Sequence, residues 1–227
     1  MMVRALAFVE GATEEKFIKE IIAPELGARE VFIRATTPGR KRSQGGMQPW
    51  ARIRRELLRY LKEDTNRFVT TMFDYYGMPT DWPGRGSARR QAHDQKAATV
   101  EDAILKDISG AMGDAFDERR FIPYVQMHEF EALLFSDPAI LGRVVSEEGI
   151  ADNLQSIADE FPSPEEIDDG PNTAPSKRIL ATCKQYQKVL HGNIAAQRIG
   201  LARMRQKCRH FAEWLTRLES LGQENET

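Results

Sequence analysis

The sequence predicts an α/β protein built on a mainly parallel four-stranded sheet, with helices on both faces and a helical annex at the C-terminus. Short apolar segments of strand length alternate with longer segments of helical periodicity. The first apolar segment runs into a glycine turn, and acidic residues directly follow two of the predicted strands. Because ligands of open α/β sheets bind beyond the carboxyl ends of the strands, these acidic residues are the first candidates for a functional site.

The first predicted strand, residues 5–9, is continuously apolar, as expected for a strand that is covered on both faces. Gly11 then allows a turn, and a helix is expected over about residues 13–26, with Glu14 and Glu15 in its first turn. Glu10 therefore lies at the carboxyl end of the first strand, facing a cleft. A structural alternative is that Glu10 only caps a neighbouring helix.

Two further strands are expected over residues 31–35 and 68–73, separated by a helix over residues 50–63. The second of these strands delivers Asp74 to the same sheet edge as Glu10. As an alternative, Asp74 is an ordinary turn aspartate before Tyr75 and Tyr76. Another helix is expected to begin at about Ala97.

The fourth strand is predicted over residues 121–126, with Pro123 indicating an edge position or an irregular start. His128, Glu129 and Glu131 follow it. Neighbours two apart on a strand share a face, whereas on a helix they point about 200° apart, so the spacing leaves open which of the two glutamates reaches the cleft. We expect His128 to be structural.

Three parts are expected along the chain: an α/β domain over residues 1–145, an acidic, proline-rich loop insertion over 146–175, and a helical annex over 176–227 packed on the same domain. Ser176 is expected to cap a helix. One long helix is expected over about residues 194–221, because its apolar residues fall on or near one face.

The net charge of −2 hides a strong segregation of charge. Residues 34–55 and 176–210 carry basic side chains and no acidic ones, whereas residues 144–170 carry acidic side chains and no Lys or Arg. The basic segments are suited to a polyanion such as nucleic acid, or are simply solvated helix faces that pair with the acidic segment. Over the basic C-terminal annex, the acidic segment 144–170 would act as an autoinhibitory phosphate mimic.

The chain has two cysteines, no signal-peptide pattern and no apolar run long enough to cross a membrane. We therefore expect a soluble cytoplasmic protein with reduced thiols and no membrane partner. A homo-oligomer is compatible with the sequence.

The candidate site is rich in carboxylates, which are the hard ligands that Mg²⁺ or Mn²⁺ prefers. A divalent cation would neutralise this charge, activate water and stabilise the leaving oxygen of a phosphodiester. We expect Glu10, Asp74, Glu129 and Glu131 to form this metal site, with Glu10 and Asp74 catalytic. Basic side chains would hold the anionic substrate, and the candidates are Lys177, Arg178, Lys188 and, in the basic loop after the second strand, Arg42.

Several motifs together resemble known families. Residues 9–14 (VEGATE) and 73–79 (FDYYGMP) are similar to the Toprim domain of topoisomerases, primases and the overcoming-lysogenization-defect nucleases. The chain more closely resembles the bacterial family known as domain of unknown function 4276. The motifs that carry this second resemblance are HEFEALLFSD at 128–137, DGP at 169–171, TAPSKR at 173–178, GL at 200–201 and CRHF at 208–211.

The resemblance implies a Toprim-like, Rossmann-like fold in which a glutamate after the first strand and aspartates after the third serve metal or acid/base chemistry. The Toprim pattern has Asp-x-Asp, but Tyr76 stands at the second acidic position here. We expect Glu129, or Glu131 if the following helix starts late, to replace the missing ligand. The resemblance also implies a nuclease effector of a bacterial defence module under the control of an ATPase partner.

The preferred interpretation is a Mg²⁺-dependent phosphodiesterase that acts on nucleic acid. A second interpretation is a catalytically silent module that binds nucleic acid or an ATPase, which the missing aspartate favours. Phosphoryl transfer on a small nucleotide fits the same carboxylates.

Overall fold

The computed structural model describes residues 2–39, 47–145, 149–167, 170 and 172–223. Its centre is a parallel sheet with the strand order β2-β1-β3-β4, and a further short strand, β5, also pairs with β3. The mainly parallel sheet flanked by helices confirms the predicted fold class. The strands are β1 (Val3–Val9), β2 (Val31–Thr36), β3 (Arg67–Asp74), β4 (Phe121–Ile122) and β5 (Val125–Gln126).

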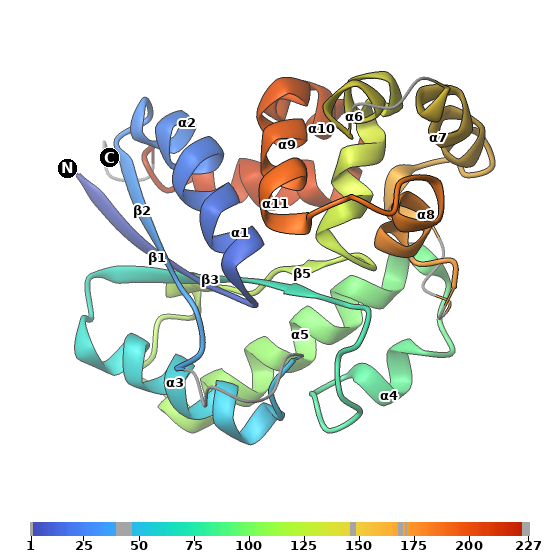
Figure 1. Ribbon diagram of the computed structural model, residues 1–227. Helices are drawn as coiled ribbons and strands as arrows, with labels where there is room; N and C mark the ends of the chain where they lie inside the picture. The colour runs from blue at the N-terminus through green and yellow to red at the C-terminus, as the bar shows by residue number, and fades with distance from the viewer. Residues whose placement is uncertain (1, 40–46, 146–148, 168–169, 171, 224–227) are drawn as a thin grey trace.

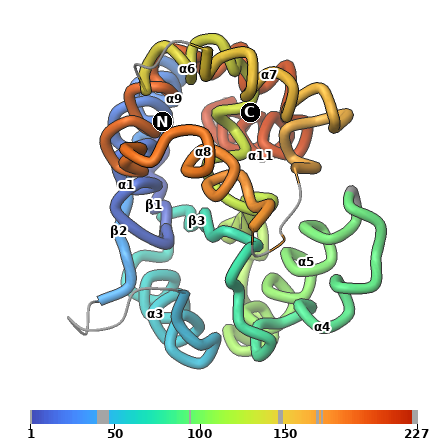
Figure 2. Tube along the Cα trace, turned by 45° about the vertical axis from the view of Figure 1, so that its right-hand side comes forward, coloured from blue at the N-terminus to red at the C-terminus, as the bar shows by residue number. Residues whose placement is uncertain are grey.

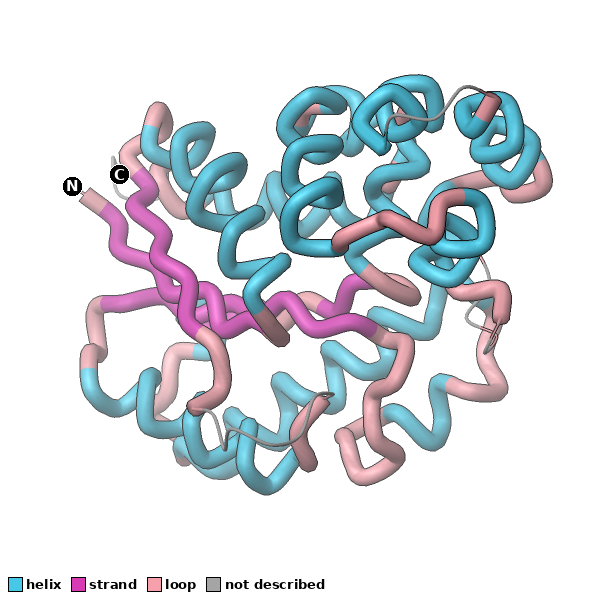
Figure 3. The backbone as a smooth tube through the Cα atoms, in the orientation of Figure 1, coloured by secondary structure: helices cyan, strands magenta, loops and turns pink. Residues whose placement is uncertain are grey.

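Helices cover both faces of the sheet, and each face has its own hydrophobic core (Figures 1 and 3). Alternate side chains of β1 enter the two cores, with Val9 in one and Phe8 in the other. The N-terminal helix on the first face continues through one π turn, as α1 (Ala12–Phe17), η1 (Ile18–Ile22) and α2 (Ala23–Gly27). The second face is covered by α3 (Trp50–Glu63), α4 (Arg85–Ala88) and α5 (His93–Met112).

The predicted fourth strand is present in two pieces, β4 and β5, which are separated by Pro123 and Tyr124. Proline has no N–H to donate, so the backbone ladder breaks here. Threonine side chains of β3 replace the missing bonds: the Tyr124 N–H donates to Thr71 Oγ1 at 2.8 Å, and Thr71 Oγ1 donates to the Tyr124 carbonyl at 2.9 Å. The interruption therefore leaves the strand direction intact up to Gln126, beside Asp74.

The C-terminal region lies on the same side of the sheet as α1 (Figure 2). The expected single helix over residues 194–221 was wrong, because the chain forms α9 (Asn193–Ile199), α10 (Leu201–Lys207) and α11 (Arg209–Ser220). Gly200 ends α9 with a φ of 77°, and Cys208 leaves the helical conformation with a φ of −119° and a ψ of 95°. The preceding elements are α8 (Pro175–Thr182) and the π turn η5 (Lys188–Gly192).

The acidic segment expected as a loop over residues 146–175 contains a helix, α7 (Ile150–Asp159), and a 3₁₀ turn, η4 (Pro164–Glu166). Ile150 and Leu154 are four residues apart and both enter the first core, so α7 has the apolar face that a packed helix needs. The elements before it are η3 (Phe130–Ser136) and α6 (Pro138–Val145). None of the helices in the described residues is long and apolar enough to cross a membrane.

The close crossing of α6 and α7 provides a test of this packing. A Cβ atom built on Gly142 would lie 2.9 Å from the Cα atom of Ala151, so Gly142→Ala should lower the free energy of unfolding by about 1–3 kcal/mol through overpacking. The matched control is Gly110→Ala in α5, where an added Cβ would have open space. This substitution should raise the free energy of unfolding by up to about 1 kcal/mol. Urea denaturation of both variants measures the difference, and equal stabilities would contradict the crossing.

Candidate functional site

The two acidic residues predicted from the strand ends meet at the carboxyl edge of the sheet. Glu10 follows β1 directly, and Asp74 is the last residue of the neighbouring strand β3. The backbone N–H of Asp74 donates to Glu10 Oε2 at 3.2 Å. Parallel pairing therefore brings together two carboxylates that lie 64 residues apart in the sequence.

Glu129 and Glu131 reach the same place from the segment after β5. Glu129 is extended, with a φ of −146° and a ψ of 160°, and Glu131 lies in the first turn of η3. The change of conformation between them turns both carboxylates to one ammonium group, with Lys188 Nζ at 3.5 Å from Glu129 and 3.0 Å from Glu131. The structure therefore brings both glutamates to the cluster, which a regular helix over this segment would not do.

C-terminal residues complete the surroundings of these two glutamates. Glu129 accepts hydrogen bonds from the backbone N–H of Ser176 at 2.8 Å and from its hydroxyl at 2.9 Å. Glu131 is fully buried and accepts a bond from the Tyr186 hydroxyl at 3.3 Å. Ser176, expected as a helix cap, is instead the second residue of α8 and binds Glu129.

Burial changes the proton affinity of the acidic cluster. Burial, and then the charge of Glu14, raise the pKa of Glu10 to about 7, against the hydrogen bond from Asp74 and the charge of Lys188. Burial, and then the charge of Glu129, raise the pKa of Glu131 to about 7, against the charge of Lys188. The pKa of Asp74 lies well above its usual value because of burial and the nearby charges of Glu10 and Glu14. Glu10 and Glu131, with pKa values of about 7, are therefore partly protonated near neutral pH.

Lys188 is the cation of this cluster. Burial lowers its pKa, but the charges of Glu131, Asp74 and Glu129 outweigh that effect and leave the pKa above its usual value. The ammonium group thus stays charged and offsets part of the negative charge. Its side chain remains 44% exposed, so it reaches the cluster from the solvent side.

The cluster has the donor chemistry for a hard cation. Asp74 Oδ1 is buried and has no hydrogen-bond partner among the described residues, which is unusual for a carboxylate oxygen. Within the part of the chain that the structure describes, no three His, Cys, Asp or Glu side chains converge as a ready metal site. The residues present fit an ion held by one or two carboxylates and completed by water, which is the usual coordination of Mg²⁺.

Two other expected substrate-binding residues, Lys177 and Arg178, make no contact with the carboxylates of this cluster among the described residues. Lys177 is exposed at the start of α8, next to Ser176. Arg178 is occupied, because its Nε donates to the Thr173 carbonyl at 2.8 Å and its guanidinium lies 3.6 Å from Glu160. Arg42 lies outside the described residues.

Sequence reasoning missed three members of the site. Glu14 was expected only to stabilise the helix start, but its buried carboxylate accepts the Gly11 N–H at 2.9 Å and raises the pKa of Glu10. Its position three residues after a glycine cap is a capping-box signal. Ser176 was predicted in another role, and no pattern in the sequence distinguished Tyr186.

The family model of the domain of unknown function DUF4276 matches residues 9–219 of the chain. The chain belongs to this family. The match confirms the family resemblance carried by the sequence motifs. No curated protein matches this DUF4276 chain.

Solved structures similar to this DUF4276 protein include the C-terminal region of the OLD protein of Xanthomonas campestris pv. campestris. A mercury-phased structure of that region has 12% sequence identity and a TM-score of 0.48, and the match covers 100% of both chains. A platinum-phased structure has 14% identity and a TM-score of 0.44, over 99% of this chain and 98% of the other.

Removal of the Lys188 ammonium tests the charge balance of the cluster. Lys188→Met should lower the free energy of unfolding at pH 8 by about 2 kcal/mol, less than for a fully buried ion pair because Lys188 is half-exposed. The loss should shrink at pH 5, because Glu10 and Glu131, with pKa values of about 7, then bind protons in the folded state and no longer attract the Lys188 ammonium group.

Urea denaturation at both pH values measures this loss. Lys177→Met is the matched control, since Lys177 is exposed and has no partner in the cluster among the described residues. A Lys188 variant as stable as this control at pH 8 would show that the ammonium does not balance the carboxylates.

Proposed function

We propose that this DUF4276 protein is a Mg²⁺- or Mn²⁺-dependent phosphodiesterase of the Toprim type that cleaves nucleic acid. The observation that carries the proposal is a buried oxygen of Asp74 that has no hydrogen-bond partner among the described residues. This carboxylate lies next to Glu10, and the pKa of Glu10 is about 7. A buried carboxylate oxygen without a donor is a natural ligand for a cation. The sequence resemblance to Toprim domains gives the reaction class.

Each carboxylate has a proposed role. Glu10 holds or releases a proton at its carboxyl group, since a pKa near 7 is matched to acid/base work at neutral pH. Asp74 is the main ligand, with Glu129 or Glu131 in place of the second Toprim aspartate. When bound, the metal ion would lower the pKa of a water molecule and stabilise negative charge on a phosphodiester.

Lys188 is the proposed phosphate-binding residue. Its ammonium group already lies beside Glu129 and Glu131 and is partly exposed, so it can contact an anionic substrate from the solvent side. Exposed Lys177 is a second phosphate contact at the start of α8. Arg178 would first have to leave Glu160, and Arg42 stays a prediction.

The cellular setting follows from the family resemblance alone. We propose a cytoplasmic effector of a bacterial defence module that works with an ATPase partner, as an α/β domain with a packed C-terminal annex. Cleavage of nucleic acid by this DUF4276 protein would then depend on that partner's state.

A second candidate function is a catalytically silent module that binds nucleic acid or an ATPase. Two observations favour it: Lys188 already supplies a positive charge to the carboxylates, and Tyr76 stands where Toprim domains have an aspartate. In this case the acidic cluster would be satisfied without any metal ion.

Calorimetric titration with Mn²⁺ and Mg²⁺ distinguishes the two functions. We expect the wild type to bind, and Glu10→Gln and Asp74→Asn each to weaken binding by at least about tenfold, because each removes an anionic ligand. Asp102→Asn is the matched control, since Asp102 is exposed on α5 and makes no contact with the cluster among the described residues. A nuclease assay on the same samples, with and without ATPase partner candidates, follows.

The outcomes separate clearly. Binding that is lost in both variants and kept in the Asp102 control supports the phosphodiesterase. A wild type that binds neither metal ion, even with a phosphodiester analogue present, overturns it in favour of the silent module. If the wild type binds a metal ion, the same titration of Glu129→Gln and Glu131→Gln identifies which glutamate completes the ligand set.

A further inference from the structure

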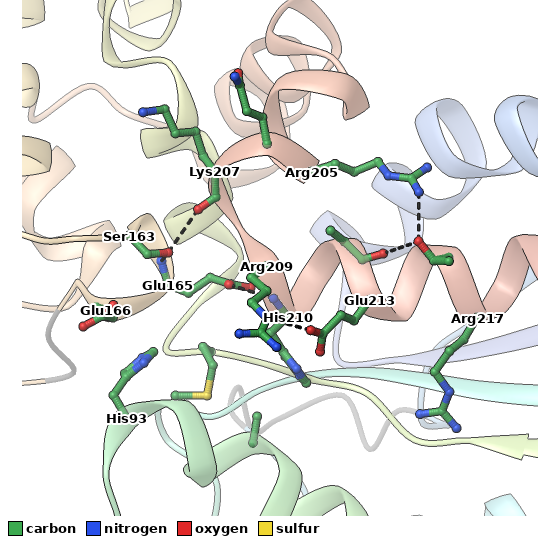
Figure 4. Close-up of a pocket in the computed structure, with 15 residues that line it drawn as sticks. His93, Ser163, Glu165, Glu166, Arg205, Lys207, Arg209, His210, Glu213 and Arg217 are labelled. Atoms are coloured by element: carbon green, nitrogen blue, oxygen red, sulfur yellow. Dashed lines mark hydrogen bonds and ion pairs between the residues drawn. The ribbon is translucent and has the colours of Figure 1, made fainter.

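A groove with a volume of about 950 Å³ lies between α11, α5 and the η4 turn, apart from the carboxylate cluster (Figure 4). One wall is the polar face of α11, where residues recur at intervals of three and four, including Arg209, Glu213 and Arg217. His93, at the start of α5, lies on the opposite wall. A volume near 1,000 Å³ is at the upper end of small-ligand pockets, so the groove takes one extended chain more readily than a duplex.

The charge of the groove favours an anion. Arg217 and Lys207 are exposed and have no carboxylate partner among the residues that the structure describes. Arg209 pairs with Glu213 at 2.7 Å, but its side chain is 92% exposed, so this ion pair is weak and its guanidinium can turn to another anion.

The acidic residues of the groove do not cancel these cations. The buried carboxylate of Glu165 accepts the backbone N–H groups of His210 at 3.0 Å and Phe211 at 2.9 Å, at the start of α11. The Glu165 carboxylate therefore interacts with the N-terminal end of α11 and not with the cations of the groove. The remaining acid on the η4 wall is the partly exposed Glu166, whose single negative charge compares with the two positive charges of Lys207 and Arg217.

Aromatic rings and apolar atoms line the same groove. His210 stacks on Tyr124 with ring centroids 5.1 Å apart, and its side chain is 24% exposed. Burial lowers the pKa of His210, but its 2.8 Å bond to Glu101 and the charge of Glu101 outweigh burial and raise the pKa above its usual value. His93 and Met127 add a further ring and an apolar surface. Sites for single-stranded nucleic acid combine these features, because bases stack on rings while cations follow the backbone.

The groove is next to the carboxylate cluster along the chain. Met127 lines the groove, and Glu129, two residues later, binds Lys188 in the cluster. Gln126, just before Met127, pairs with Asp74 in the neighbouring strand. Neighbouring strands are about 4.8 Å apart, so Met127 lies near the strand that ends at Asp74.

We propose that this groove binds a single strand of nucleic acid, with Lys207, Arg209 and Arg217 contacting its phosphates and His93 and His210 contacting its bases. The proposal rests on the proposed function, for which it supplies the strand that is led to the carboxylate cluster. It also assigns a role to Lys207 and Arg209 of the basic segment 176–210, which do not take part in the carboxylate site.

Fluorescence anisotropy with a labelled single-stranded oligonucleotide of about 16 nucleotides tests the groove, in DNA and RNA form and with EDTA present. Replacement of Lys207, Arg209 and Arg217 together by Ala should weaken binding by about tenfold or more. Because each phosphate contact contributes about 0.7 to the slope of log K against log salt concentration, the slope should fall by about 2.

The matched control replaces Lys19, Lys62 and Arg143 by Ala, which removes the same charge from exposed positions outside the groove. Equal affinity of the two triple variants overturns the proposal, as does a wild type that binds neither oligonucleotide. A groove variant that loses binding of a poly-glutamate peptide but not of the oligonucleotide also overturns it, in favour of an acidic protein partner. Since EDTA removes metal ions, these results are independent of whether the carboxylate cluster binds a metal.

Discussion

The contact between Lys188 and the buried carboxylates is the interaction on which the arrangement of the site depends. Parallel pairing of β1 and β3 fixes Glu10 and Asp74 at one sheet edge, and the segment after β5 adds Glu129 and Glu131. Carboxylates so close together in a buried place raise one another's pKa and oppose folding at neutral pH. The ammonium group of Lys188, which lies 57 residues after Glu131 in the sequence, reduces this cost.

The same contact explains how one site fits two functions. A lysine and a divalent cation both supply positive charge to carboxylates, but only the cation acts as a Lewis acid. Lys188 is partly exposed, so under the proposed function it would be able to shift toward a phosphate group if a metal ion neutralised Asp74 and Glu10. Among the described residues, Asp74 Oδ1 has no hydrogen-bond partner, so under the proposed function it is the oxygen that a cation would contact.

The sheet and the strand-end carboxylates could be predicted from the sequence because both follow from local patterns. A short apolar run predicts a buried strand, and parallel strands must bring their ends together. The parts of the site that could not be predicted from the sequence depend on contacts between distant segments. Nothing local to Tyr186 indicates Glu131 as its partner, and Ser176 has the same appearance whether it caps a helix or binds Glu129. The breaks at Gly200 and Cys208 interrupt an apolar periodicity that otherwise continues, so the pattern predicted one helix.

The C-terminal region completes the surroundings of the acidic cluster. It supplies Lys188, Tyr186 and Ser176 to the carboxylates, and from α11 it supplies Trp214, whose indole N–H donates to Thr70 of β3 at 2.8 Å. Without these groups, Glu129 and Glu131 would be buried with no donor of their own from the N-terminal half that the structure describes. Unpaired buried charges are costly, so the α/β domain and its annex depend on each other for the integrity of the site. The boundary expected at residue 176 therefore separates segments that differ in charge. The acidic cluster nevertheless contains residues from both sides of that boundary.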